Sequence, residues 1–118
     1  MKFLMTYAAN PDAPPPTPEQ MMKIGKFTQE MLERGVVLMT GGLQRPSKDT
    51  HVRLEDGKFS ITDGPFPETK ELIDGFALID VASREEAIEH AKAFMQLAGD
   101  GAGEVLQVFE PPGAAPKS

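Results

Sequence analysis

The chain is organised around a nine-residue stretch that joins two strand-like halves, Asp63-Gly64-Pro65-Phe66-Pro67-Glu68-Thr69-Lys70-Glu71. Pro65 and Pro67 have a fixed φ and no amide donor, so the stretch can be neither a helix interior nor a central strand. Gly64 precedes a proline and is therefore pushed toward extended backbone. The stretch predicts a stiff, charged loop in which Phe66 is an aromatic anchor to a core.

Strand and helix signals alternate on both sides of this loop. Thr17 with Gln20, and Ser83 with Glu86, have the spacing of capping boxes and predict two helix starts. The dipeptide Asp56-Gly57 between two alternating runs is a hairpin turn signal. The expected elements are a strand over residues 2–8, a helix over 18–34, a strand over 36–39, a hairpin over 50–54 and 58–62, a strand over 75–81, a helix over 84–98 and a strand over 104–109.

This order of elements predicts an α+β fold. It is the order of a ferredoxin-like split βαβ domain with a β-hairpin inserted at its centre. We expect one domain over residues 1–110, and a mobile tail rich in Pro, Ala and Gly over residues 111–118.

The predicted strands carry apolar side chains on both faces. In the first strand, Phe3 and Met5 alternate with Leu4, and in the last strand Val105 alternates with Leu106. Two helices cover only one face of a four-stranded sheet, and a second apolar face open to water would be unusual in a monomer. We therefore expect a homodimer in which two sheets pack face to face.

Composition narrows the functional class. Hydrophobic residues make up 40% and charged residues 25% of the 118 residues, as in ordinary soluble domains. The net charge of −6, without a block of Lys or Arg, argues against nucleic acid or an anionic membrane as partners. No run approaches the roughly 20 apolar residues of a membrane span. The chain has no cysteine, which fits a reducing compartment, and we expect a cytoplasmic protein.

The candidate site is centred on the loop. Asp63 is the candidate general base, and Lys70 the candidate partner for negative charge on a substrate. The candidate ligand-binding residues are Tyr7, Gln44, Arg45, Phe66 and Glu71. The competing interpretation is structural: Asp63 caps the turn through the backbone, and the other charges are solvated.

The two histidines, His51 and His90, have no metal-ligand spacing. We expect both at the surface, with His90 off the apolar stripe of the second helix. No metal and no cofactor is predicted.

The loop and the strand after it resemble the signature of the DGPF-domain branch of the YCII-related family. The matching residues are Asp63-Gly-Pro-Phe66, Glu68-Thr-Lys-Glu71 and Gly75-Phe76. The resemblance covers roughly residues 1–110 and implies a dimeric α+β barrel. The wider group is linked with a proposed His-Asp active site, but the predicted helix over residues 18–34 has no histidine.

Two functional hypotheses follow. The first is a protein that binds a small, anionic or enolisable organic molecule, as a cofactor-free enzyme by analogy of fold. The second is a non-catalytic accessory or sensory module, since DGPF-domain proteins resemble companions of extracytoplasmic-function sigma factors.

Overall fold

The computed structural model describes residues 1–43, 50–63 and 74–110. Its elements are β1 (Lys2–Ala9), α1 (Pro18–Glu33), β2 (Val37–Gly42), β3 (Thr50–Glu55), β4 (Lys58–Asp63), β5 (Gly75–Asp80), α2 (Arg84–Ala98) and β6 (Gly101–Gln107). Both predicted helices and all predicted strands are confirmed. The boundary of the last strand was wrong: it begins at Gly101 rather than Glu104, because two glycines that disfavour strands are held in the ladder by β1.

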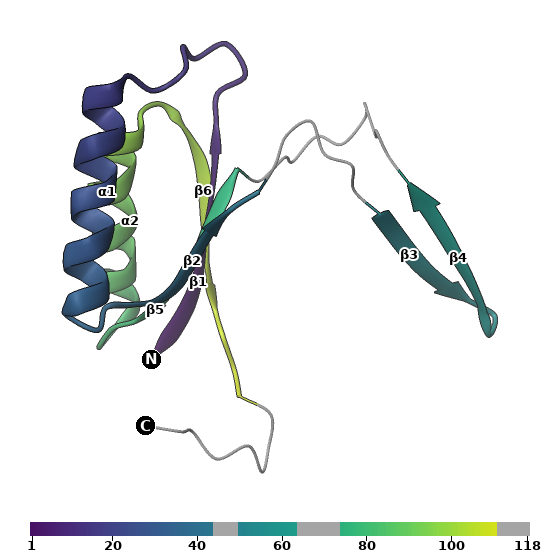
Figure 1. Cartoon of the computed structure of the whole chain (residues 1–118). Helices are drawn as coiled ribbons and strands as arrows, with labels where there is room; N and C mark the ends of the chain where they lie inside the picture. The colour runs from purple at the N-terminus through teal and green to yellow at the C-terminus, as the bar shows by residue number, and fades with distance from the viewer. Residues whose placement is uncertain (44–49, 64–73, 111–118) are drawn as a thin grey trace.

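The α+β class is confirmed by the arrangement of these elements (Figure 1). Four strands form an antiparallel sheet in the order β2-β5-β1-β6, and β3 and β4 form a separate two-stranded sheet. The strands of each βαβ half are thus not adjacent: β5 separates β1 from β2, and β1 separates β5 from β6.

The helix starts follow from local chemistry. Thr17 Oγ1 accepts a hydrogen bond from the Gln20 amide at 3.1 Å, and Gln20 Oε1 accepts one from the Thr17 amide at 2.9 Å, so the first capping box is confirmed. At α2, Ser83 Oγ accepts from the Glu86 amide at 3.2 Å. The Glu86 carboxylate accepts from the Ala82 amide instead of the Ser83 amide, so the second box is formed only in half.

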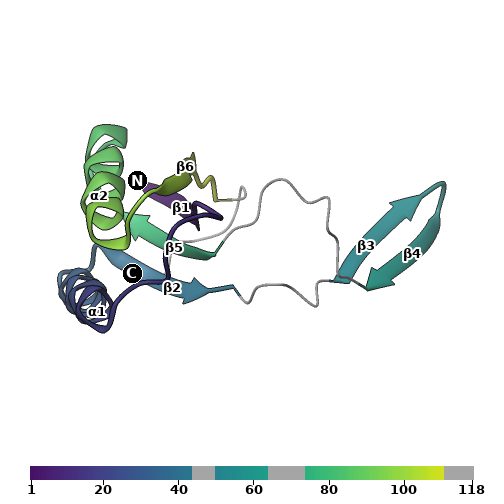
Figure 2. The ribbon, with the colours of Figure 1, turned by 90° about the horizontal axis from the view of Figure 1, so that it is seen from above.

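Both helices lie on the same face of the four-stranded sheet (Figure 2). The core is small, and its buried side chains are Phe3, Met5, Val37, Ile79 and Ala87. Met31 of α1 and Phe94 of α2 pack against it. The core therefore consists of the inward residues of β1, β2 and β5 and the facing stripes of the helices.

The helix-free face of the sheet carries an apolar row that crosses all four strands. Met39, Leu78, Leu4 and Leu106 are register neighbours, in that order, across β2, β5, β1 and β6. They alternate with the buried core residues and therefore point away from the helices. Met39 is 59% and Leu106 46% exposed. The expectation of apolar side chains on both faces is confirmed.

The hairpin of β3 and β4 turns at Asp56 and Gly57, whose φ angles of 51° and 76° match the predicted two-residue turn. Val52 pairs with Ile61 and Leu54 pairs with Phe59, so these four side chains share one face of the hairpin. Every residue of both strands is exposed.

Candidate functional site

A cavity of about 80 Å³ lies between the helices and the covered face of the sheet. Most of its wall is apolar, with side chains such as Met5, Val37 and Phe94. Its polar lining residues come from four different elements: Thr6 and Tyr7 from β1, Thr28 from α1, Thr40 from β2 and His90 from α2. An apolar cavity with a few convergent polar groups is the usual form of a small-molecule site.

His90 is the residue that the sequence interpretation placed wrongly. It was expected at the surface, but it is half-buried, lines the cavity and packs its ring on Phe27 with centroids 5.2 Å apart. It lies three residues after Ala87 and four before Phe94, so the helical spacing that puts those two inward also puts His90 near the sheet. That spacing was the signal that could have identified it.

Burial lowers the pKa of His90 below its ordinary value. The imidazole is therefore mainly neutral at pH 7, with one nitrogen that donates and one that accepts a hydrogen bond. Within the described part of the chain neither nitrogen has a hydrogen-bond partner. A ligand in the cavity could therefore form a hydrogen bond with His90 without breaking one that the described residues make.

Tyr7 contributes its ring to the cavity and its hydroxyl to the end of α2. The hydroxyl donates to the carbonyl oxygen of Gly99 at 2.8 Å, and the ring meets Phe94 edge to face at a centroid distance of 5.4 Å. Burial, and then the nearby carboxylates of Asp74 and Asp100, raise the pKa of Tyr7. The phenol therefore stays protonated over the physiological range and holds one wall of the cavity.

Glycine and threonine shape the opposite wall, at the end of β2. Gly41 lies so close to Phe76 that an added Cβ would sit 3.1 Å from the Phe76 ring. Thr40 Oγ1 donates to the Phe76 carbonyl at 2.9 Å, which leaves the lone pairs of this lining residue able to accept hydrogen bonds.

Asp74 ties the strand ends together near the same place. Its carboxylate accepts from the Ala9 amide at 2.6 Å, its own amide donates to Tyr7 O at 2.8 Å, and its carbonyl accepts from the Leu43 amide at 2.7 Å. Asp74 has no local signal in the sequence, because its contacts join segments that are far apart in the chain. Tyr7 and Asp74, for example, are separated by 67 positions. Its role is to position the strands rather than to face the cavity.

The other predicted site residues divide into two groups. Asp63, the last residue of β4, is exposed, accepts a hydrogen bond from Thr50 Oγ1 at 2.8 Å, and is not among the cavity-lining residues. Of the two predicted site residues that the structure describes, Tyr7 lines the cavity and Asp63 does not. Five candidates lie outside the described residues: Gln44, Arg45, Phe66, Lys70 and Glu71.

No group of three His, Asp or Glu side chains gathers as a metal site within residues 1–43, 50–63 and 74–110. In the same part of the chain, neither helix is long and apolar enough to cross a membrane.

Comparison with known proteins identifies the family of this chain. The model of the YCII-related domain matches residues 1–111. The chain belongs to the YCII-related family. It is also 49% identical over 72 residues to "Uncharacterized protein R00369" of Rhizobium meliloti (strain 1021). That match covers 61% of this chain and 58% of the relative's length.

In this YCII-related protein, the histidine at the cavity belongs to α2. Helix α1 has no histidine and contributes Phe27 and Thr28 to the same cavity. Within the described part of the chain, His90 is the histidine that lines this cavity.

Proposed function

We propose that the protein binds a small organic molecule in the cavity between its helices and its sheet. The observation that carries this proposal is the half-buried imidazole of His90, which lines an apolar cavity without a hydrogen-bond partner among the described residues. A buried polar group without a partner costs stability unless water or a ligand satisfies it.

The size of the cavity limits the ligand. One water molecule needs roughly 10–15 Å³ of such space, so the cavity of about 80 Å³ has room for roughly five to eight non-hydrogen atoms. Ligands near the size of a phenol or a short-chain acid are favoured, and larger ones would have to extend beyond the cavity. The mostly apolar lining favours an apolar body with one or two hydrogen-bonding groups.

The charge of the ligand depends on two residues. His90 is mainly neutral at pH 7, so the described lining offers hydrogen bonds but no full positive charge to an anion. An anionic or enolisable acid, the class expected from the sequence, would need Lys70 as its counter-charge. A cofactor-free reaction would use His90 or Asp63 as the group that takes a proton.

We also propose the assembly in which this site works. The strand order β2-β5-β1-β6 is the one expected for a ferredoxin-like split βαβ domain. The apolar row of Met39, Leu78, Leu4 and Leu106 supports a second sheet packed on the helix-free face. Two copies related by a two-fold axis would then form a dimeric α+β barrel.

The alternative function is a non-catalytic accessory module linked to extracytoplasmic-function sigma factors. It would be favoured by an interaction surface outside the cavity, and the exposed apolar residues of β3 and β4 are such a surface. A protein of this kind would bind no small molecule in the cavity.

A fragment screen by thermal shift separates these hypotheses. Neutral and anionic fragments of similar size, such as phenol and butyrate, are tested on the wild type and on the variants His90→Phe and Thr28→Val. Glu89→Gln, on the exposed side of α2, is the matched control. We expect hits that raise the melting temperature of the wild type and the control but not of the cavity variants. Equal shifts of the melting temperature in all four proteins would show that the fragments do not bind in the cavity, and would contradict the proposal.

The same screen on Asp63→Asn and Lys70→Met tests the loop. Loss of the anionic hits in Lys70→Met, with the neutral hits retained, would assign the counter-charge to Lys70. Unchanged hits in both variants would leave Asp63 and Lys70 outside the site.

A further inference from the structure

The β3–β4 hairpin has one apolar face and one polar face. Val52, Leu54, Phe59 and Ile61 form the first, while Arg53, Ser60, Glu55 and Lys58 pair on the second. The four apolar side chains are 66%, 60%, 72% and 68% exposed, in that order. Alternation of this kind is typical of a strand pair that is covered on one side. Among the described residues of the single chain, nothing covers the apolar face.

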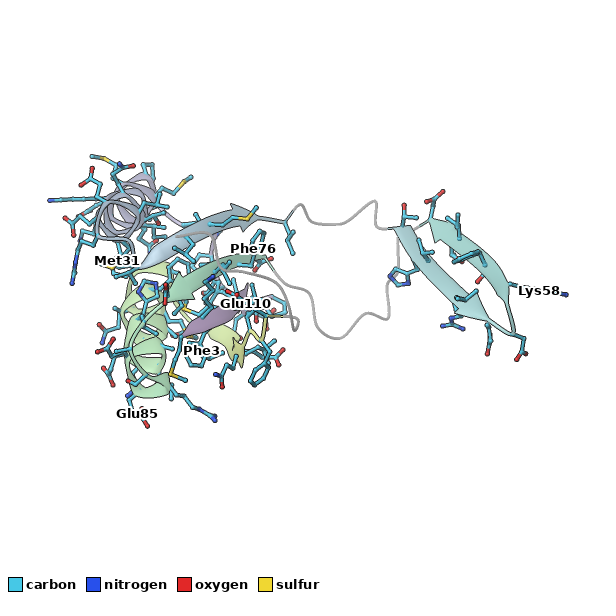
Figure 3. The ribbon with its side chains drawn as sticks, turned by 90° about the horizontal axis from the view of Figure 1, so that it is seen from below. Phe3, Met31, Lys58, Phe76, Glu85 and Glu110 are labelled. Atoms are coloured by element: carbon cyan, nitrogen blue, oxygen red, sulfur yellow. The ribbon has the colours of Figure 1, made fainter. Side chains whose placement is uncertain are left out.

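The position of the hairpin indicates what covers it. Figures 1 and 2 both show the hairpin beyond the four-stranded sheet, on the side away from α1 and α2. Lys58, at the hairpin turn, lies at the end farthest from the sheet (Figure 3). The Cα radius of gyration is 16.6 Å, whereas a compact chain of this length would have about 13.5 Å. The molecule is therefore open on its helix-free side.

Two apolar surfaces stay exposed among the described residues: the apolar face of the hairpin, and the row of Met39, Leu78, Leu4 and Leu106 on the helix-free face of the sheet. A second copy packed on the sheet would occupy the space beside the hairpin. Because a two-fold axis makes each contact twice, each copy would receive the other's hairpin.

The area involved is that of a stable interface. Four side chains of this size, each about two-thirds exposed, present on the order of 400 Å² of apolar surface. Burial of both hairpin faces against equal areas of the partner would remove on the order of 1,600 Å², which is the size of a standard specific interface. An isolated two-stranded hairpin is marginal in water, so this contact would also stabilise the hairpin itself.

We propose that the β3–β4 hairpin is a dimerisation arm, whose apolar face of Val52, Leu54, Phe59 and Ile61 packs on a second copy of this chain. The inference rests on the proposed homodimer and adds the surface that joins its copies.

The first test compares two cross-strand double variants by sedimentation over a dilution series. In Leu54→Thr/Phe59→Thr the apolar pair is replaced by residues that still favour strands. In the control, Glu55→Thr/Lys58→Thr, the neighbouring pair on the polar face is replaced without change in net charge. We expect the first variant to weaken dimerisation at least about tenfold, and the control to dissociate as the wild type does.

The second test locates the arm. The Phe59 ring is replaced by a photo-crosslinking phenylalanine analogue, and this protein is mixed with ¹⁵N-labelled wild type. Crosslinked peptides that join unlabelled β4 to labelled sheet residues would confirm contact between copies. Crosslinks only within one chain would show that the hairpin folds back on its own sheet, and would overturn the proposal.

The outcomes separate the two proposals. A wild type that is monomeric at micromolar concentration removes the dimer and the arm together. A dimeric wild type whose dissociation is unchanged in Leu54→Thr/Phe59→Thr, and which gives no crosslink between copies, removes the arm alone. The ligand screen on the cavity is independent of both results.

Discussion

His90 shows how a single side chain can change the interpretation of a site. From its neighbours in sequence it has the character of a surface residue, yet the packing of α2 on β1 brings it to the cavity beside Phe27. Burial then favours the neutral imidazole. Both properties that make it a candidate, its position and its protonation state, come from tertiary contacts.

The lowered pKa of His90 predicts a pH dependence of stability. The unfolded chain binds a proton on this imidazole near pH 6.5, and the folded chain only at lower pH. The part of the unfolding free energy that depends on His90 therefore has its full value above about pH 6.5. It decreases as the pH falls from there toward the pKa of the folded state. We expect His90→Gln to lose less unfolding free energy than the wild type between pH 7.5 and pH 5, measured by urea denaturation.

His51→Gln is the matched control for this measurement, since it removes the other histidine and leaves the buried imidazole in place. Parallel pH profiles for the wild type and His90→Gln would contradict the prediction.

At the scale of the elements, local sequence signals determined most of the fold. Thr17 and Gln20 form the expected capping box, and Asp56 and Gly57 form the expected turn, because both depend on residues within four positions of each other. The cavity was not predictable in this way, since Thr6, Phe27 and His90 meet only after α1 and α2 dock on the sheet. The register shift between Val37 and Met39 in β2 likewise has no local signal.

We expect replacement by alanine to have opposite effects on the free energy of unfolding at two glycines. At Gly103 in β6, an added Cβ would collide with the backbone oxygen of Thr6 on β1, so the strand must shift. We expect Gly103→Ala to lower the free energy of unfolding by about 1–3 kcal/mol.

Gly25 in α1 is the comparison, because nothing lies within 4 Å of a Cβ placed there. A helix-interior alanine is preferred to glycine, so Gly25→Ala should raise stability by about 0.5–1 kcal/mol. Urea denaturation of both variants gives the two signs. If both substitutions change the free energy of unfolding in the same direction, then either β6 tolerates a side chain at position 103 or a side chain at position 25 does not stabilise α1.

At the scale of the whole molecule, one sheet has two apolar faces and only two helices. The helices cover Phe3, Met5 and Ile79, while Leu4 and Leu106 remain on the other side. Alternation along β1 and β6 was enough to predict this mismatch from the sequence. What the sequence pattern did not reveal was that the inserted hairpin would extend toward the same uncovered side (Figure 1).

The apolar sheet face that the helices leave uncovered predicts a homodimer. Light scattering at micromolar concentration should therefore give a mass near twice the 12.8 kDa of the chain. Leu106→Lys places a charge in the apolar row and should shift the mass toward that of one chain, because a buried unpaired charge opposes association. Gln29→Lys, which adds the same charge to an exposed position of α1, should leave the dimer intact. A monomeric wild type would refute the barrel.

Tyr7 also gives the protein an optical property. The chain has one tyrosine and no tryptophan, so its near-ultraviolet tyrosine fluorescence comes entirely from a ring in the cavity wall whose hydroxyl is bound to the Gly99 carbonyl. Emission from the unmodified protein is thus a label-free signal from one known place. Filling of the cavity, or release of the end of α2, becomes visible without any probe being introduced.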